Sequence, residues 1–335
     1  WVGISGSHIL VEQSKGVVAV SKSNGEIIEE DVERAVEAAR TVATPLNYEI
    51  LHVIPKNYTV DGQIGVKDPI GMTGVRLEVD TQIIQGLSAY IKNLTKAVYR
   101  TGVDINELVL SILATASAVS TERQRELGVA VVNIGGATTS LVVYEEGDIL
   151  DTAILPIGSE HITADIAIGL RTSIEVAERL KLQYGTSIVK TVAKDEQIDL
   201  AELGASETEM IDRRYAAEII EARAEEILEK IDKLFKKIGK SGRLPAGVIL
   251  TGGGAKLTGL VETAKEKLRL PVTLGYPLNI TSSTGKVNDL AFTTAIGLVR
   301  WGEFYSGQRD RSLGKLVNHF KSVTKVKYWL QNLMP

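Results

Sequence analysis

The sequence contains no cysteine and only 4 histidines in 335 residues. Without cysteine, disulfide bonds, thiolate nucleophiles and zinc sites with thiolate ligands are excluded. The histidines are too scattered for a metal centre built from imidazole groups; they are His8, His52, His161 and His319. We therefore predict no metal site made by protein side chains alone.

Aromatic residues are also scarce, at 5%, whereas glycine occurs 31 times. This mix disfavours a carbohydrate or single-strand binder built on aromatic platforms and favours an α/β protein with many tight turns. The charge is nearly balanced, with 38 Lys and Arg against 42 Asp and Glu and a formal net charge of −4. That excludes a strongly basic surface for nucleic-acid phosphates, so no nucleic-acid partner is predicted.

Long apolar runs are missing as well. No stretch of about 18 uncharged apolar residues occurs, so no segment is expected to cross a membrane as a helix. The first residues, WVGISGSHIL, lack the basic start and apolar core of a signal peptide. Hydrophobic residues make up 44% and charged residues 24%. These values predict a globular protein of a reducing compartment, and the length is typical of two domains, with three as the alternative.

Residues 1–113 predict a small α+β unit. Helical spacing of apolar residues begins at Asp31, and Ser88 is expected to cap a second helix. Pro55 is expected to end a strand, and the glycines of 61–74 predict a loop. Apolar stretches predict the strands, at 1–11, 17–20, 48–54, 76–84 and 108–113.

After residue 128 the pattern changes to a β-meander with turns at Gly135-Gly136 and Glu146-Gly147. Its predicted strands are 128–134, 139–144 and 149–155, and a further buried strand is 247–250. Apolar residues at helical spacing predict helices at 159–168, 173–184, 212–238 and near 288–300. Residues 190–210 are weakly patterned, and 302–312 are predicted to be a linker.

Two apolar strands run directly into glycine, in VVNIGGATTS (131–140) and VILTGGGAKLTGL (248–260). Glycine lets backbone N–H groups approach an anion with no Cβ in the way, and a helix N-terminus after the second loop would add a favourable dipole. One such loop is weak evidence, because most glycine pairs are only turns. Two of them fit a cleft between two lobes; two tight turns are the alternative.

The two loops resemble the phosphate-2 and adenosine motifs of the actin/Hsp70/hexokinase ATPase superfamily, and AFTTAIGLVRWG (291–302) resembles its second connecting helix. Within that superfamily the chain resembles the bacterial cell-division family FtsA. The stretch 51–79 is specific, because it matches the inserted subdomain 1C that this family carries in place of subdomain 1B. The matching stretches keep their order along almost the whole chain: 51–79, 126–144, 156–181, 246–262 and 277–282.

The resemblance implies an actin-like (ribonuclease H-like) two-lobed α/β fold. The implied divisions are subdomain 1C with its flanking strands at 1–113, a remnant of subdomain 1A at 114–127, the first part of 2A at 128–185, 2B at 186–244, the second part of 2A at 245–290, the connecting helix to 1A at 291–301, the linker at 302–312 and a membrane-targeting helix at 313–335. The phosphate-1 hairpin of the superfamily should precede subdomain 1C, and nothing resembling it lies before Trp1. We therefore expect a chain that is incomplete at its N-terminus.

Members of the FtsA family bind ATP, form actin-like protofilaments, tether FtsZ to the inner face of the cytoplasmic membrane and help recruit later division proteins. The resemblance implies a peripheral protein on the cytoplasmic face of the cell membrane at the division site. Its implied partners are a second copy of itself, the C-terminal peptide of FtsZ, an anionic membrane surface and, through subdomain 1C, later divisome proteins.

Carried over by motif, the resemblance implies an ATP site with Mg²⁺. The β- and γ-phosphates would lie on Gly135, Gly136, Ala137, Thr138 and Thr139, and the adenosine on Gly252, Gly253 and Gly254. Glu178 and Lys181 would contact the ribose. For these two residues, an exposed i,i+3 ion pair is the alternative.

Asn133 stands where the superfamily usually has Asp, and Ala137 replaces the next glycine. A neutral amide holds hydrated Mg²⁺ and orients the attacking water less strongly than a carboxylate. We therefore expect nucleotide binding with slow hydrolysis or none, and assign no catalytic residue. Because the phosphate-1 hairpin is also missing, we expect this chain to bind ATP weakly if at all.

The helix predicted at 212–238 falls in subdomain 2B, which in this family receives the acidic-hydrophobic FtsZ peptide. The resemblance implies that Arg213, Arg214 and Arg223 pair with acidic residues of that peptide. The alternative is a solvated helix face whose arginines pair with Glu218, Glu221 and Glu226.

Residues 313–335 predict a basic amphipathic helix. They contain four lysines and no acid, a local charge of +4 that leaves the rest of the chain more acidic than its total suggests. Lys321 and Lys325 lie opposite an apolar face of Val323, Val326, Trp329, Leu330, Leu333 and Met334. Such a helix is suited to a membrane interface, where each lysine near an anionic leaflet contributes roughly 1 kcal/mol. A C-terminal helix docked on its own domain is the alternative.

Two other functions fit parts of the pattern. An actin-like protein of pilus assembly would share the fold and an inserted subdomain, but the basic tail and the VIPKNYTVDG block favour the FtsA family. A sugar or acetate kinase would need an acid or base aimed at a substrate hydroxyl, and Asn133 argues against it.

Overall fold

The computed structural model describes residues 1–42, 45–280 and 286–308. The chain divides into two compact units. Unit 1 comprises residues 1–4, 8–110 and those from Leu298, and unit 2 comprises 5–7 and 111–297. Each unit has its own sheets and helices and is described separately.

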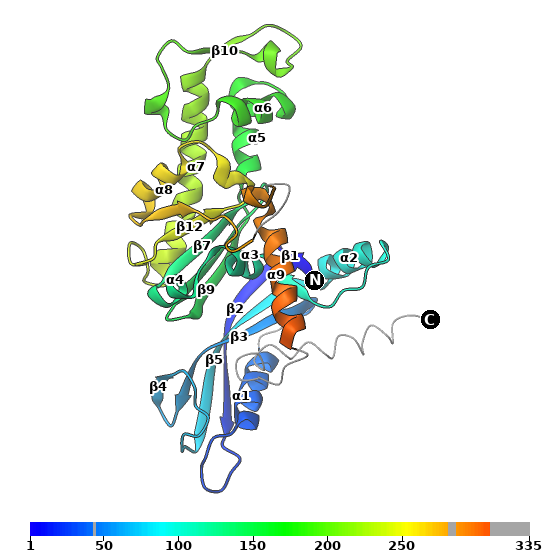
Figure 1. The fold of residues 1–335 in the computed structure, drawn as a ribbon, viewed down its shortest axis with the longest axis vertical. Coiled ribbons are helices and arrows are strands. Elements are labelled where there is room, and N and C mark those ends of the chain that lie inside the picture. Colours follow the sequence, from blue (N-terminus) through cyan, green and yellow to red (C-terminus); the bar gives the residue numbers. More distant parts are fainter. Residues whose placement is uncertain (43–44, 281–285, 309–335) are drawn as a thin grey trace. The chain divides into compact units, whose positions relative to one another are not determined.

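Unit 1 contains a four-stranded antiparallel sheet in the order β2–β5–β3–β4 (Figure 1). Helix α1 (Glu29–Val42) packs on it around Leu77 and Val79, both fully buried. A Cβ at Gly16 would lie 1.9 Å from the carbonyl oxygen of Ala35, so only glycine lets the helix come this close. The strands are β2 (Ile9–Ala19), β3 (Tyr48–Val60), β4 (Gln63–Val66) and β5 (Arg76–Leu87).

A parallel pair, β1 (Val2–Ile4) with β6 (Leu108–Leu110), and helix α2 (Ser88–Tyr99) complete unit 1. His52 of β3 joins the two sheets, because its Nε2 accepts a hydrogen bond of 3.0 Å from the N–H of Leu110. The imidazole is 4% exposed. Burial disfavours its charged form and lowers the pKa of His52 to about 4, so the ring is a neutral structural acceptor at pH 7.

Several expected boundaries in unit 1 are wrong. Residues 9–19 form one strand instead of parts of two. Strand β3 continues through Pro55, since a register shift between Pro55 and Asn57 accommodates the missing N–H of proline. Strand β4 lies inside the predicted loop 61–74, and Ser88 begins α2 without capping it. The strand predicted at 108–113 ends at Leu110, and helix α3 (Ser111–Val119) begins at the next residue.

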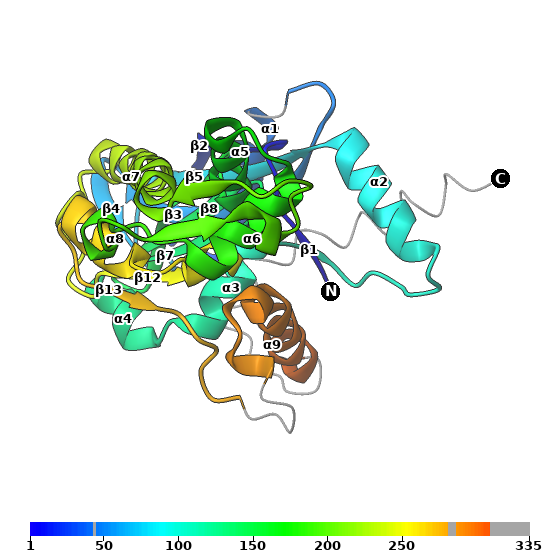
Figure 2. The ribbon, with the colours of Figure 1, turned by 90° about the horizontal axis from the view of Figure 1, so that it is seen from above.

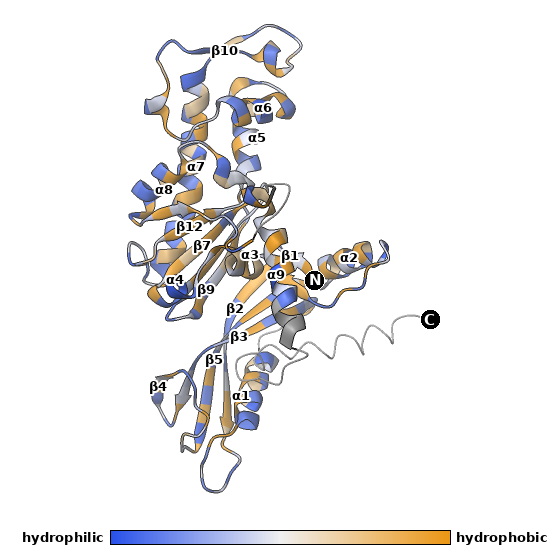
Figure 3. Ribbon diagram, viewed as in Figure 1, coloured by the Kyte–Doolittle hydropathy of each residue, from blue (hydrophilic) through white to orange (hydrophobic). Residues whose placement is uncertain are grey.

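Unit 2 is built on a five-stranded sheet in the order β13–β12–β7–β8–β9. The predicted β-meander is confirmed, with β8 and β9 antiparallel to their neighbours, whereas β12 and β13 run parallel to β7. Figure 3 shows β7 and β12 as mostly hydrophobic strands, and all their residues except Asn133 are buried. The strands are β7 (Val129–Ile134), β8 (Thr139–Glu145), β9 (Asp148–Leu155), β12 (Val248–Thr251) and β13 (Val272–Leu274).

Helices surround this sheet. Helix α5 packs against α6 and α7, and α5 and α7 lie side by side in Figure 2. The helices of unit 2 are α3 (Ser111–Val119), α4 (Glu122–Leu127), α5 (Ser159–Leu170), α6 (Ile174–Tyr184), α7 (Arg213–Lys237) and α8 (Leu260–Leu268). A small hairpin of β10 (Gln197–Asp199) and β11 (Met210–Asp212) precedes α7, in the stretch 190–210 that is weakly patterned in the sequence.

Helix α9 (Thr293–Gln308) begins in unit 2 and ends in unit 1. The prediction of a linker from residue 302 is wrong over 302–308, because these residues continue helix α9. The remainder of that linker and the predicted membrane helix at 313–335 lie outside the described residues. Over the part of the chain that the structure describes, no helix is both long and apolar enough to span a bilayer.

Candidate functional site

The two glycine loops meet at one edge of the sheet of unit 2. Strands β7 and β12 are parallel neighbours with Asn133 opposite Thr251, so both run into glycine at the same level. A Cβ at Gly252 would lie 2.2 Å from Oδ1 of Asn133, and one at Gly254 would lie 2.5 Å from Cγ2 of Ile134. Side chains at these glycines would force the loops apart. The carboxyl ends of parallel strands are where open α/β sheets bind ligands.

The first loop presents a row of unused donors. The N–H of Gly135 donates to the carbonyl of Thr138 at 2.9 Å and closes the turn. The next three N–H groups, of Gly136, Ala137 and Thr138, donate to no acceptor among the described residues. The loop is partly exposed, so the three groups are open to a ligand. Consecutive free N–H groups form a concave anion site, and their number and spacing fit a phosphate group.

The start of α5 holds this loop in place. The N–H groups of Ser159 and Glu160 donate to the carbonyls of Gly135 and Gly136, both at 2.9 Å. A Cβ at Gly158 would lie 2.2 Å from the carbonyl oxygen of Gly136. The carbonyls of Gly135 and Gly136 are therefore used by α5, whereas the N–H groups of Gly136, Ala137 and Thr138 keep no acceptor among the described residues.

Thr139 is the one predicted phosphate residue that faces inward. It is fully buried, and its Oγ1 donates to the carbonyl of Ile157 at 2.8 Å. It therefore supports the turn from inside, and the loop segment 136–138 carries the free donors.

Glu178 and Lys181 of α6 form an ion pair of 2.6 Å, and the side chain of Lys181 is only 8% exposed. Nζ of Lys181 also donates to Oγ1 of Thr163 at 2.7 Å. Burial acts to raise the pKa of Glu178, but the hydrogen bonds from Lys181 and Thr163 outweigh it and lower the pKa. The carboxylate stays charged and 41% exposed, so the pair offers an acceptor to solvent while its cation is buried.

Asn133 is held as an amide. Its Nδ2 donates to Oγ1 of Thr294 at 3.0 Å, and Thr294 in turn lies 2.8 Å from Oγ1 of Thr115. A carboxylate could not donate to Thr294, but it could accept from it, so the surroundings tolerate aspartate as well. Within the described ranges, no cluster of acidic and histidine side chains could hold a metal ion by itself.

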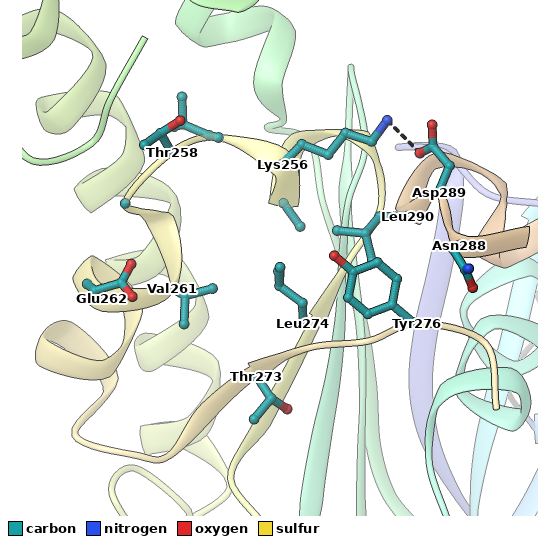
Figure 4. Close-up of a pocket in the computed structure, with 13 residues that line it drawn as sticks. Lys256, Thr258, Val261, Glu262, Thr273, Leu274, Tyr276, Asn288, Asp289 and Leu290 are labelled. Atoms are coloured by element: carbon teal, nitrogen blue, oxygen red, sulfur yellow. Dashed lines mark ion pairs between the residues drawn. The ribbon is translucent and has the colours of Figure 1, made fainter. Parts of the chain in front are cut away.

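A pocket of about 1110 Å³ lies just beyond the second glycine loop (Figure 4). Its wall is formed by the 3₁₀ turn Gly253–Lys256, the start of α8 and strand β13. Nζ of Lys256 pairs with Asp289 at 2.5 Å at one end of the pocket, and Tyr276, 44% exposed, lines it.

Sequence reasoning missed Lys256, Tyr276 and Asp289. Lys256 directly follows the glycine motif and could have been found from it. Tyr276 and Asp289 carry no local pattern, and only the packing of β13 and of residues 288–290 brings them to the pocket.

The three predicted partner-binding arginines differ in their surroundings. Arg213 binds Glu196 at 2.5 Å and the carbonyl of Tyr184 at 3.0 Å. Arg223 makes two bonds to Asp165, of 2.5 and 2.9 Å, and one to Glu226.

Arg214 is the most exposed of the three, at 38%, with Glu218 3.9 Å away. Glu218 and Glu226 thus pair with arginines of the same helix, as expected for a solvated helix face. Glu221 instead accepts from the N–H of Val189.

An apolar surface lies along α5 and α7. Ile168 is 76% exposed at the end of α5, and Tyr215 is 48% exposed in the first turn of α7. A Cβ at the neighbouring Gly169 would lie 2.5 Å from Cδ1 of Ile219, so the two helices are in close contact here. Apolar side chains next to the arginine-bearing helix form a surface with both hydrophobic and cationic groups.

Solved structures identify the fold. A chain of the PilM–PilN type IV pilus biogenesis complex matches with a TM-score of 0.63, covering 89% of this chain and 77% of its own length at 16% identity. MreB5 of Spiroplasma citri bound to ADP matches with a TM-score of 0.52, covering 67% of both chains at 16% identity. The chain has the actin-like α/β fold.

Sequence comparison then identifies the family. Residues 130–297 match the family described as cell division protein FtsA, and residues 6–85 match the SHS2 domain inserted in FtsA. FtsA of Bacillus subtilis is 39% identical over 313 residues, covering 93% of this chain and 70% of that protein. FtsA of Pseudomonas aeruginosa is 36% identical over 302 residues, covering 90% and 72%. The chain belongs to the FtsA family of cell division proteins.

Proposed function

We propose that this chain is an ATP-binding, filament-forming adaptor that tethers FtsZ to the cytoplasmic face of the membrane at the division site. Recruitment of later divisome proteins is assigned to subdomain 1C, in unit 1, and self-association to protofilament contacts. Family membership supports the role in division. The observation that best supports ATP binding is the row of free N–H groups at Gly136, Ala137 and Thr138, beside a second glycine loop.

In this proposal, the first loop binds the β- and γ-phosphates, and Gly252, Gly253 and Gly254 face the adenosine. Glu178 faces the ribose, and the buried Lys181 takes part through its ion pair with Glu178. The pocket beside Lys256 takes the base. Bound Mg²⁺ would neutralise phosphate charge. Asn133 is neutral and holds the metal's water shell weakly, so ATP binds weakly and hydrolysis is slow. Solved structures of MreB5 with ADP and with AMPPNP support a nucleotide as the ligand class.

Titration calorimetry with ATP and Mg²⁺ tests the nucleotide site. We expect a millimolar dissociation constant for the unaltered chain and none measurable for Gly136→Val, because a Cβ there would lie 2.4 Å from Oε1 of Glu160 and would displace the loop that carries the free N–H groups. Gln63→Val is the control, because Gln63 is exposed in strand β4 of unit 1, where a β-branched side chain suits the backbone. Equal binding by the Gly136 variant would overturn the phosphate assignment.

For the FtsZ peptide, the surface of Ile168, Tyr215 and Arg214 is the proposed dock. Arg214 contributes most of the charge, because Arg223 is already neutralised by Asp165 and Glu226. Fluorescence anisotropy with a labelled FtsZ C-terminal peptide should show about tenfold weaker binding for Arg214→Glu, the size expected when a charged hydrogen bond is lost. Lys233→Glu, exposed near the other end of α7, is the control. Equal weakening in both variants would argue for a non-specific charge effect.

The membrane anchor is proposed for residues 313–335 from their sequence. Deletion of this segment should abolish co-sedimentation with vesicles that contain anionic lipid. Neutral vesicles provide the control for charge. Unchanged co-sedimentation after deletion would place the membrane contact elsewhere.

A further inference from the structure

Thr163 of α5 lies at the centre of the polar contacts beside the proposed ribose position. It is 3% exposed. Its Oγ1 donates to Oε2 of Glu178 at 2.5 Å and accepts from Nζ of Lys181 at 2.7 Å. One hydroxyl therefore bonds to both members of the ion pair on α6.

The same turn of α5 also binds the phosphate loop. Nζ of Lys181 donates to the carbonyl of Ser159 at 3.3 Å, and the N–H of Ser159 donates to the carbonyl of Gly135 at 2.9 Å. A continuous set of hydrogen bonds thus runs from Glu178 through Thr163 and Lys181 to the first glycine loop. Every member belongs to unit 2.

The geometry has a chemical consequence at the carboxylate. Oε2 of Glu178 is occupied by Thr163 and Lys181, while Oε1 has no hydrogen-bond partner among the described residues. A side chain that is 41% exposed would otherwise rotate freely. Holding Oε2 leaves Oε1 as a fixed acceptor for O–H or N–H donors, and the donors that a ribose offers are hydroxyls.

We propose that Thr163 is a positioning residue, which holds Glu178 so that Oε1 accepts from the ribose hydroxyls and which ties this contact to the phosphate loop through Lys181 and Ser159. This inference rests on the proposed nucleotide function and deepens it. Thr163 itself does not touch the ligand.

Two variants separate hydroxyl chemistry from packing. Thr163→Val keeps the shape and removes the hydroxyl, whereas Thr163→Ser keeps the hydroxyl. Thr152→Val is the matched control, because Thr152 is 2% exposed and its Oγ1 has no hydrogen-bond partner among the described residues. Replacement of such an unsatisfied group by a methyl is close to neutral. Circular dichroism of each variant checks that it remains folded.

The first measurement needs no ligand. Carboxyl ¹³C NMR of the full chain follows the titration of Glu178. The bond from Thr163 lowers the pKa of Glu178, so Thr163→Val should raise it, while Thr163→Ser and Thr152→Val should leave it in place. An unchanged pKa in Thr163→Val would overturn the claim that Thr163 holds the carboxylate.

The second measurement compares ATP with 2′,3′-dideoxy-ATP by ligand-observed NMR, which detects weak binding. The unaltered chain should prefer ATP by about tenfold, the value of one hydrogen bond to a charged group. Thr163→Val should lose this preference, and Thr163→Ser should keep it. Full preference in Thr163→Val would overturn this inference alone. Absence of binding by the unaltered chain would overturn the proposed function, and the inference with it.

Discussion

The two glycine loops end neighbouring strands of one sheet, yet they are held by different forces. The first is fixed by backbone hydrogen bonds to α5, and Gly158 permits their close approach. The second is fixed by packing, since Gly252 and Gly254 lie directly on Asn133 and Ile134. Hydrogen bonding leaves the first loop with aligned free donors, which suit a charged group. Packing makes the second loop a tight platform, which suits a flat and less polar group.

The largest expected effect comes from breaking the backbone contact of the first loop. In Gly158→Val, the new Cβ would lie 2.2 and 2.6 Å from the carbonyl oxygens of Gly136 and Gly135. We expect a loss of about 3 kcal/mol in the free energy of unfolding, measured by urea denaturation, because neither carbonyl can move without losing its bond to α5.

Gly253→Ala is the contrasting control in the second loop, since no atom lies within 4 Å of its Cβ position. Its cost should stay below about 1 kcal/mol. Similar losses in the two variants would show that the two loops are not held differently.

The packing contact of the second loop is tested by Gly254→Ala, whose Cβ would lie 2.5 Å from Cγ2 of Ile134. Overpacking of this kind costs about 2 kcal/mol. Combined with Ile134→Ala, which removes the opposing methyl, the loss should be smaller than the sum of the two single losses by at least about 0.5 kcal/mol. Strict additivity would mean that the loops do not touch through Ile134.

The start of α1 in unit 1 is held by the carboxylate of Asp31, so its stability depends on pH, unlike that of the two glycine loops. Burial acts to raise the pKa of Asp31, but bonds from Arg34, Ile28 and Ser21 outweigh it and lower the pKa to about 2 from 3.8. The stabilisation, about 2 kcal/mol, is complete above pH 3.8 and is lost as the pH falls through 2.

Asp31→Asn should therefore lower stability at pH 7 and flatten the decline in the acid range, as followed by unfolding at several pH values. Gly158→Val should shift the whole stability profile without changing its slope, because no titrating group is involved. A steep acid decline that persists in Asp31→Asn would assign it to other carboxylates.

The smallest effect is expected for Asn133→Asp, between the two loops. Thr294 can donate to the new carboxylate, so folding should change little. The added charge should strengthen the dependence of ATP binding on Mg²⁺ by about tenfold, or about 1.4 kcal/mol. Calorimetric titrations with and without Mg²⁺ measure this; no change would mean that residue 133 does not face the metal.

Much of unit 2 could be predicted because its signals are local. Apolar strands such as 129–134 that end in glycine are recognised from a few adjacent residues, and the 3.6-residue spacing of α7 persists for 25 residues. The strands of unit 1 were harder to predict. Pro55 lies inside β3 because the pairing of β3 with β5 shifts register there, and this pairing is not visible in the sequence around Pro55. Strand β4 is four residues long and depends on pairing with β3, so its sequence carries little signal of its own.

The candidate site also has features with a local sequence signal and features that depend on contacts between distant segments. The sequence by itself determined the two glycine loops, Asn133 and the family, because each depends on a contiguous motif. Only the tertiary structure decided that Thr163 lies between Glu178 and Lys181, that Asp165 neutralises Arg223 across 58 residues, and that Lys256 meets Asp289. These contacts depend on which faces of α5, α6 and α7 pack together, and packing is a property of the assembled core that no short stretch of sequence encodes.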